Sequence, residues 1–408
     1  MDGWTTADPT TATLKTQALI TSKIIELIPF DMQLTYDNWD YQTMCSAILP
    51  LSVLDDDIPS SFTVCGHLAH MNLRTEFLPY KYLLAELVLD KSNGIKTVVN
   101  KTDDVGADSL FRTFPMELLA GEDNTIVQIK EADCRFTFDF AKVYWNTRLS
   151  HEHERIVAKF QPGEAVCDLM AGVGPFALPA GKKGVFVWAN DLNPDSFSAL
   201  RDNIIANKVQ PFVTAFNEDG KMFIKKAIND LYTMHCSPKD NPVVLPAEKP
   251  RFRKDPALRI PAPEPKKIPL PATFAHFVMN LPATAVSFLG AYRGCYQGLE
   301  KPFEEGKFEM PMIHVHTFHR ETDESPLEDA ERAICAEVSE ALGAPMTAEN
   351  VDVHDVRRVA PNKGMYCASF RLPEEAAFGD PMPPVVEDRA TLVRKEDEKN
   401  WKKWTRDD

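Results

Sequence analysis

The sequence predicts an α/β protein built on a Rossmann-like, doubly wound sheet. One apolar run ends at Asp168, a glycine turn follows, and a second apolar run at 185–189 ends at Asn190 and Asp191. This order of strand, glycine turn, helix, strand and acid is typical of the first half of a nucleotide-binding sheet. Further strands are predicted from apolar runs at 212–215, 274–279 and 312–318.

Composition limits the class of protein. The chain has 408 residues, of which 44% are hydrophobic, enough for more than one domain with a packed core. No apolar run approaches the roughly 18 residues that a membrane span needs, so we expect no membrane association. The eight cysteines are scattered without a CxxC pair, which indicates free thiols. A net charge of −15 excludes a nucleic-acid coat protein but permits an enzyme with one basic face.

Before the sheet, the pattern predicts helices and strands of a smaller α+β region. The expected elements are helices at 14–28 and 81–90 and strands at 125–129 and 135–140. We therefore expect four parts: a weakly assigned N-terminal region (1–60), an α+β region (61–150), a Rossmann-like domain (151–380) and a charged tail (381–408).

Within the Rossmann-like domain, short helices are expected at 176–180 and 199–207. Ser325 and Glu328 have the form of a capping box, which predicts a helix that runs to Leu342 and stops at Gly343. The last two strands should be an antiparallel pair at 351–359 and 365–372. The proline-rich stretch 237–271 lacks apolar periodicity, and we expect a disordered insertion there.

The glycine turn carries information about the ligand. Gly172 and Gly174 lack a Cβ, so the backbone can adopt positive φ and lie close to a ligand. The spacing departs from GxGxxG, and Asp168 stands just upstream, which disfavours a phosphate. A cationic ligand such as S-adenosylmethionine fits better than NAD, with Asp191 placed to accept hydrogen bonds from ribose hydroxyls. A glycine turn in an unrelated α/β protein is the alternative.

A second motif, Asn280-Leu281-Pro282, follows the apolar run at 274–279. Strand carboxyl ends face the ligand crevice in a doubly wound sheet, and Pro282 stiffens the backbone there. An Asn amide can pair with the edge of a nucleic-acid base as donor and acceptor. An ordinary strand-ending turn is the alternative.

Three histidines, His314, His316 and His319, alternate along the strand expected at 312–318. No Cys, Asp or Glu lies within the strand expected at 312–318. We therefore expect histidines of the core or surface and no metal site.

These motifs occur within a series of blocks that resembles the archaeal and eukaryotic tRNA (guanine(37)-N1)-methyltransferase family. The blocks span about residues 65 to 372 and keep their order: CGHLAHMNLR, LPYKYLLAELVLDK, FRTFPMELLAGEDN, VYWNTRLSHEHERIV, DLMAGVGPFALPA, ANDLNP, NEDGKMF and FVMNLPATA. The resemblance implies a class I methyltransferase fold with N-terminal RNA-binding regions. It also implies methylation of guanosine 37 of tRNA at N1, which maintains the reading frame and begins wybutosine synthesis in tRNA-Phe.

The resemblance also implies roles for single residues. Glu152 matches the proposed general base, Arg112 the arginine that stabilises the reacting guanine, and Tyr144 an aromatic residue that lines the site. Asn280 and Pro282 match the loop that packs on cofactor and base. The positions that match methyl-donor contacts are His153, Asp191, Leu192, Asp219, Gly220 and Asn280.

Elementary chemistry agrees with two of these roles. Guanine N1 carries a proton at neutral pH, so a base must remove it as the methyl group transfers. We expect burial to raise the pKa of Glu152 for that purpose. Charge then spreads onto O6, where a fixed cation such as Arg112 stabilises the transition state. From sequence alone, a helix-surface carboxylate is the favoured interpretation of Glu152 and a buried salt-bridge arginine that of Arg112, and only the resemblance reverses this.

Two other functions remain open at this point: an aminocarboxypropyl transferase of the same fold, and an inactive tRNA-binding scaffold. Asn280-Leu281-Pro282 favours methyl transfer, because the sister family resembles Asn-Leu-Gly there. The family resemblance implies cytoplasm, nucleus and mitochondrial matrix as locations, although the N-terminus shows no clear transit peptide. We expect a monomer, tRNA as partner and no metal.

Overall fold

The computed structural model describes most of the chain: residues 14–25, 33–53, 58–59, 62–102, 111, 113, 115–245, 264–304, 306–320, 326–360 and 362–381. The helix expected at 14–28 is shorter, because α1 (Leu14–Thr21) gives way to turns from residue 22 to 25. The tail after 381 and the proposed cap residue Ser325 lie outside the described residues. None of the described helices is long and apolar enough to cross a lipid bilayer.

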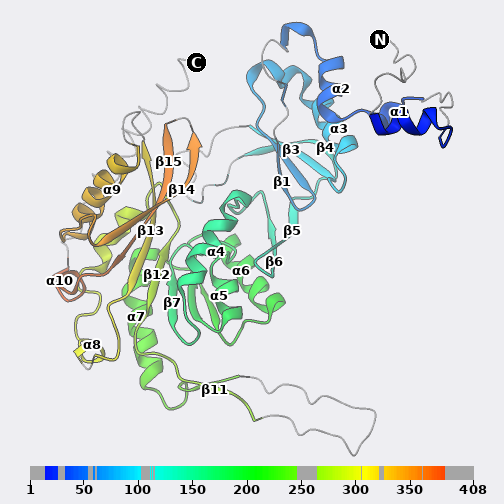
Figure 1. Ribbon diagram of the computed structural model, residues 1–408. Coiled ribbons are helices and arrows are strands. Elements are labelled where there is room, and N and C mark those ends of the chain that lie inside the picture. The colour runs from blue at the N-terminus through cyan, green and yellow to red at the C-terminus, as the bar shows by residue number, and fades with distance from the viewer. Residues whose placement is uncertain are drawn as a thin grey trace, which may run out of the picture.

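Seven strands form the main sheet in the order β14-β15-β13-β12-β7-β8-β9 (Figure 1). Their bounds are β7 (Ala165–Asp168), β8 (Phe186–Asn190), β9 (Val213–Phe216), β12 (His276–Met279), β13 (Met312–Arg320), β14 (Val351–Ala360) and β15 (Lys363–Arg371). β15 runs antiparallel to both of its neighbours, whereas the pairs from β13 to β9 are parallel. The doubly wound sheet and the antiparallel pair predicted from the sequence are confirmed.

Helices pack on both faces of this sheet. Buried residues of α4 (Ser150–Lys159), α5 (Ala177–Lys183) and α6 (Pro194–Asn207) pack on one face. Those of α7 (Gly220–Cys236), the 3-10 segment η7 (Ala285–Tyr292) and α9 (Pro326–Leu342) pack on the other. The short helices α8 (Lys301–Glu304) and α10 (Glu374–Ala377) lie in connections. Along β7, Val166 faces the first layer and Cys167 the second, as the period of two requires.

Two helices differ in length from the expectation. α6 starts at Pro194 and not near 199, because the side chain of Asn193 accepts a hydrogen bond from the amide of Asp195, and proline suits the first helical position. α5 continues to Lys183 and ends where Gly184 adopts φ +87°.

The strand order reverses next to β7. The chain adds β8 and then β9 on one side of β7 and later returns to place β12 on the other side. Ligands of doubly wound sheets bind in the crevice that such a reversal leaves at the carboxyl ends of the strands. Asp168 ends β7, and Asn280 follows β12 directly.

The N-terminal region holds a separate four-stranded sheet in the order β1-β2-β3-β4. Its elements are α2 (Tyr41–Ile48), β1 (Phe62–Cys65), β2 (Leu68–Met71), the 3-10 segment η4 (Thr75–Tyr80), α3 (Lys81–Lys91), β3 (Thr97–Lys101) and β4 (Met116–Gly121). α2 and α3 bury their apolar side chains against this sheet. The domain limits near 60, 150 and 380 remain predictions.

The hairpin of β5 (Ile126–Glu131) and β6 (Cys134–Asp139) lies between the two sheets (Figure 1). Two side chains of α6 bind the backbone of β6. Asn203 Oδ1 accepts from the amide of Thr137 at 2.9 Å, and Asn207 bonds both the amide (2.9 Å) and the carbonyl (2.6 Å) of Arg135. The asparagines therefore satisfy an edge that a two-stranded hairpin would leave open.

The sequence predicted a disordered insertion at 237–271, and this prediction is wrong at both ends of the stretch. β10 (Val243–Val244) pairs with β11 (Lys267–Ile268), and Asn241 Oδ1 accepts from the amide of Leu270 at 2.9 Å. Leu270 is buried in the core cluster on the α7 face of the sheet. This burial orders the end of the stretch, and no apolar periodicity in the local sequence indicated it. Residues 246–263 lie outside the described part of the chain.

Two buried histidines stack inside the sheet. The rings of His276 and His314 lie 5.3 Å apart at an interplanar angle of 18°, and His276 Nδ1 is 3.0 Å from His314 Nε2. Burial lowers the pKa of His276 to about 4 and holds the pKa of His314 well below its usual value. Both rings are therefore neutral at neutral pH.

We predict that this pair makes the protein sensitive to acid. The folded-state pKa of His276 lies below the unfolded value of about 6.5, so its contribution to stability is complete above that pH and is lost as the pH falls towards 4. His276→Gln should reduce the loss of unfolding free energy between pH 7 and 5, measured by urea denaturation. His151→Gln, at an exposed histidine, is the control. Identical losses in wild type and both variants would contradict the prediction.

Candidate active site

Acidic and amide side chains gather at the carboxyl edge of the sheet. Asp168 ends β7, Asp191 follows β8, Asp219 is the third residue after β9, and Asn280 follows β12. These strands are neighbours, so their ends lie at one edge on both sides of the strand-order reversal. The sequence-predicted cofactor residues at these positions therefore lie along one edge of the sheet, where doubly wound sheets bind their ligands.

The glycine turn is built on two glycines with different surroundings. Gly172 has φ +55° and Gly174 has φ +101°. A Cβ on Gly174 would lie 2.8 Å from Leu200 Cδ1 and 3.0 Å from Leu178 Cγ, so a side chain there would disturb the packing of the turn on α5 and α6. A Cβ on Gly172 would meet nothing within 4 Å, which leaves room for a ligand beside the backbone. The amide of Gly172 donates to Asp191 Oδ2 at 2.8 Å and ties the turn to the end of β8.

Asp168 is a fully buried acid. Among the described residues, no donor makes a hydrogen bond of ordinary geometry to either carboxylate oxygen. Burial and the nearby Asp191 raise the pKa of Asp168 to about 8, against the smaller opposing effects of the Met170 amide and His316. Asn280 Oδ1 is likewise buried without a partner in the described part of the chain. Buried acceptors of this kind suit a ligand that brings its own N–H donors and positive charge.

Asn190 holds three strand ends together. Its amide donates to the carbonyls of Leu169 (3.2 Å) and Glu218 (3.0 Å), and its Oδ1 accepts from the amide of Glu218 at 2.9 Å. Asp191 is further fixed by the amide of Asn193, 2.9 Å from Oδ1. The ends of β7, β8 and β9 are thereby kept in register at the crevice.

The remaining residues that were predicted to contact the methyl donor differ in their exposure to solvent. Leu192 is 43% exposed. Asp219 caps α7 by accepting from the amides of Lys221 (2.9 Å) and Met222 (3.2 Å). Gly220 is buried, and a Cβ there would lie 3.1 Å from the ring of Phe288.

Glu152 is buried on α4 with 4% of its surface exposed, so the interpretation as a helix-surface carboxylate is wrong. Arg155 binds both of its oxygens, with Nε 2.6 Å from Oε2 and Nη2 2.8 Å from Oε1. His316 Nε2 lies 2.7 Å from Oε1. The expected rise in pKa is also wrong. Burial does act to raise the pKa of Glu152, but His316 and Arg155 outweigh it and lower the pKa to about 2.

The three strand histidines have partners that their sequence neighbourhood did not show. His314 and His316 are buried in the core, as expected. β13 and β15 place Cys367 opposite His316, and the ligand atoms of Glu152, His316 and Cys367 lie within 4.8 Å of one another. A metal ion there would be repelled by the cationic Arg155, which already forms a salt bridge with Glu152.

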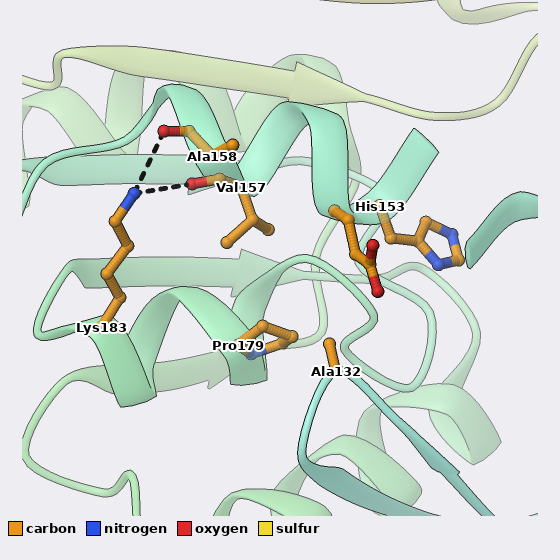
Figure 2. Close-up of a pocket in the computed structure, with 7 residues that line it drawn as sticks. Ala132, His153, Val157, Ala158, Pro179 and Lys183 are labelled. Atoms are coloured by element: carbon orange, nitrogen blue, oxygen red, sulfur yellow. Dashed lines mark hydrogen bonds between the residues drawn. The ribbon is translucent and has the colours of Figure 1, made fainter. Parts of the chain in front are cut away.

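His153 lies on α4 and contacts both the β5–β6 hairpin and the segment after the glycine turn. Its Nδ1 is 2.6 Å from Glu131 Oε1, and its ring meets Phe176 edge-on at 4.9 Å. His153 lines a cavity of about 200 Å³ between α4, α5 and the turn of the β5–β6 hairpin (Figure 2). Figure 2 also shows Lys183 donating to the last carbonyls of α4, Val157 (3.2 Å) and Ala158 (3.1 Å). Glu152 is not among the residues that line this cavity.

Three further residues were predicted to belong to the catalytic site: Tyr144, Pro282 and Arg112. Tyr144 is 48% exposed, and its hydroxyl accepts from Asn146 Nδ2 at 3.4 Å. The carbonyl of Pro282 accepts from the amide of Phe318 at 3.2 Å, which ties the loop after β12 to β13. Arg112 lies outside the described residues.

Sequence reasoning missed two residues that contact Glu152. Arg155 had a local signal, because a residue three positions further along a helix lies on the same face. His316 had none, because 164 residues separate it from Glu152.

Known proteins resemble this chain over most of its length. A model of the TRM5/TYW2 methyltransferase domain matches residues 125–240, and a model of the TYW2 N-terminal domain matches residues 42–125. A Neurospora crassa tRNA (guanine(37)-N(1))-methyltransferase is 50% identical over 370 residues, which cover 88% of this chain and 75% of that protein.

Two solved structures share the fold. The complex of aTrm5 and tRNALeu has a TM-score of 0.56 at 21% identity, covering 87% of this chain and 86% of that one. Methanocaldococcus jannaschii Trm5 in complex with adenosine has a TM-score of 0.50 at 20% identity, covering 87% and 84%.

We predict different effects of alanine at the two turn glycines. Gly174→Ala should lower the unfolding free energy by about 1–3 kcal/mol, because its Cβ would collide with Leu200. Gly172→Ala should mainly weaken S-adenosylmethionine binding, by tenfold or more, because its Cβ would fill the open space. Calorimetric titration and thermal melts measure the two effects. Gly163→Ala, at φ +88° with nothing within 4 Å, controls for backbone strain alone. Unchanged affinity in Gly172→Ala would contradict the assigned site.

Proposed function

The chain belongs to the tRNA (guanine(37)-N(1))-methyltransferase family, and we propose that it transfers the methyl group of S-adenosylmethionine to N1 of guanosine 37 in tRNA. One structural observation carries the proposal. His316 lies 2.7 Å from Glu152 and 3.3 Å from the carbonyl of Met279, the residue before Asn280. The predicted base and the predicted base-holding loop therefore meet at one side chain beside the crevice.

The residues of the crevice fit the cofactor. Asp168 is a buried acid without a hydrogen-bonded partner among the described residues, and it suits the ammonium of the methionine part. Asp191 and the open face of Gly172 suit a nucleoside, and the M. jannaschii Trm5 structure is a complex with adenosine. When bound, the sulfonium of S-adenosylmethionine supplies an electrophilic methyl group.

The protein side of the reaction is removal of the N1 proton. Glu152 is ionised at neutral pH, because Arg155 and His316 stabilise its charge, so it can accept a proton from N1. Negative charge then develops on O6 of the guanine. We assign Arg112 to stabilise that charge, by resemblance to the family.

The second partner is tRNA. A base in the anticodon loop must leave its stack to bring N1 into the crevice, which costs less in a loop than in a duplex. We assign the region before residue 150 to hold the rest of the tRNA through phosphate and shape contacts. A single chain carries the cofactor turn, the base and this region, so we propose that the monomer is the working unit.

Methyl transfer is favoured over aminocarboxypropyl transfer. The curated relatives with 43–50% identity are named as methyltransferases, and Asn280-Leu281-Pro282 is present in this chain. The alternative of an inactive scaffold is tested by the experiment below.

We predict that Glu152→Gln lowers the single-turnover rate of 1-methylguanosine formation by about 10²–10⁴-fold, since an amide cannot accept the N1 proton. The measurement uses labelled S-adenosylmethionine and an unmodified tRNA transcript with guanosine at position 37, followed by nucleoside analysis. Glu154→Gln, at an exposed carboxylate two residues along the same helix, is the matched control and should keep the wild-type rate.

Each outcome has a distinct meaning. Equal rates in wild type and Glu152→Gln would remove the general-base role and leave the activity standing. A wild-type protein that binds both ligands and forms no 1-methylguanosine would overturn the proposed function.

A further inference from the structure

Glu152 presents a limited number of acceptor positions. A carboxylate has about four lone-pair positions on its two oxygens. Among the described residues, Oε1 receives hydrogen bonds from Arg155 Nη2 and His316 Nε2, and Oε2 receives one from Arg155 Nε. His354 Nε2 lies 4.0 Å from Oε2, beyond hydrogen-bond distance. Oε1 is therefore fully used, whereas Oε2 keeps one position for a further donor.

His316 faces an acceptor on each side of its ring. Nε2 lies 2.7 Å from the carboxylate of Glu152, and Nδ1 lies 3.3 Å from the carbonyl of Met279. Carboxylates and carbonyls accept hydrogen bonds and cannot donate them, so the geometry requires an N–H on both nitrogens. His316 is therefore an imidazolium that joins the end of β12 to α4.

Titratable groups from four elements interact with His316: Glu152 of α4, Cys367 of β15, His314 of β13 and Asp168 of β7. Arg155 of α4 and His354 of β14 lie instead beside its partner Glu152. Burial acts to lower the pKa of His316, but Cys367 and Glu152 outweigh it and raise the pKa to about 10. The neutral His314 on the same strand is turned towards His276 and Ser369.

We propose that His316 is a positioning residue for the methyl transfer: its Nε2–H holds Oε1 of Glu152, so that Oε2 is the oxygen left to accept the N1 proton. This role rests on the proposed function. In the step, the N1–H bond breaks and an O–H bond forms at Oε2. The N1 electron pair bonds the methyl carbon, and the electrons of the C–S bond remain on sulfur. His316 keeps both of its protons throughout.

Two variants separate position from charge. His316→Leu removes the donor and the charge, so the carboxylate keeps its contacts with Arg155 but loses the bond that occupies the second position on Oε1. His316→Gln keeps an N–H donor but removes the positive charge that lowers the pKa of Glu152. His314→Gln, two residues away on the same strand with no bond to Glu152, is the matched control.

The experiment measures single-turnover formation of 1-methylguanosine from pH 5 to 9, with affinities for S-adenosylmethionine and tRNA and a thermal melt for each variant. We expect His316→Leu to be about 100-fold slower with both affinities within threefold of wild type. His316→Gln should lose less activity, and its rate should fall at higher pH than that of wild type on the acid side, because Glu152 becomes easier to protonate. His314→Gln should keep the wild-type pH profile.

A double variant tests whether His316 acts through Glu152. If it does, Glu152→Gln/His316→Leu should be no slower than Glu152→Gln alone. Additive losses would overturn the proposal, and so would an unchanged pH profile in a folded His316→Gln. If His316→Leu fails to fold, the His316→Gln profile and a Glu152→Gln/His316→Gln double variant decide the question. Absence of product from wild type would instead refute the proposed function.

Discussion

The site depends on one buried carboxylate held between two cations. Glu152 belongs to a helix on one face of the sheet, and His316 to a central strand, so their contact fixes the helix against the sheet. Burying a charge is costly unless opposite charges and hydrogen bonds replace water, and removing one partner of such a set costs about 3–5 kcal/mol. The contact between Glu152 and His316 therefore both holds α4 against the sheet and keeps Glu152 ionised.

Asparagine side chains fix the loops at the carboxyl edge of the sheet by hydrogen bonds, just as the ion pairs fix Glu152. Asn190 joins the ends of three strands, and Asn203 joins the β5–β6 hairpin to the glycine turn through the carbonyl of Val173 at 3.3 Å. Each amide satisfies backbone groups that irregular segments would otherwise bury without partners. The crevice is thus built from loops, yet its edges are held by side chains from regular elements.

Local patterns predicted the parts of the fold whose causes are local. The strand that ends at Asp168, the turn at Gly172 and Gly174, and the antiparallel pair at the C-terminus all follow from short-range periodicity and glycine conformation. The surroundings of Glu152 could not be predicted in this way. Its low pKa comes from His316 and Arg155, and strand pairing brings His316 from far along the chain.

Contacts between residues far apart in sequence also explain the wrong predictions at the ends of the proline-rich stretch. Leu270 has no periodic neighbours in sequence, and its burial comes from the core on the α7 face. Arg112 and the capping residue Ser325 lie outside the described residues, so their predicted roles stand as predictions.

The separation of 164 residues between Glu152 and His316 also sets an order of events during synthesis. At roughly 5–20 residues per second, the ribosome needs on the order of 10–30 s to add that length of chain. Until His316 is added, Glu152 has its helix neighbour Arg155 as partner. β12, the second neighbour of β7, is synthesised before His316. Pairing between distant parallel strands is slow in itself. The nascent chain therefore carries the glycine turn well before it has an active centre, because β13 must emerge before Glu152 on α4 gains its contact with His316.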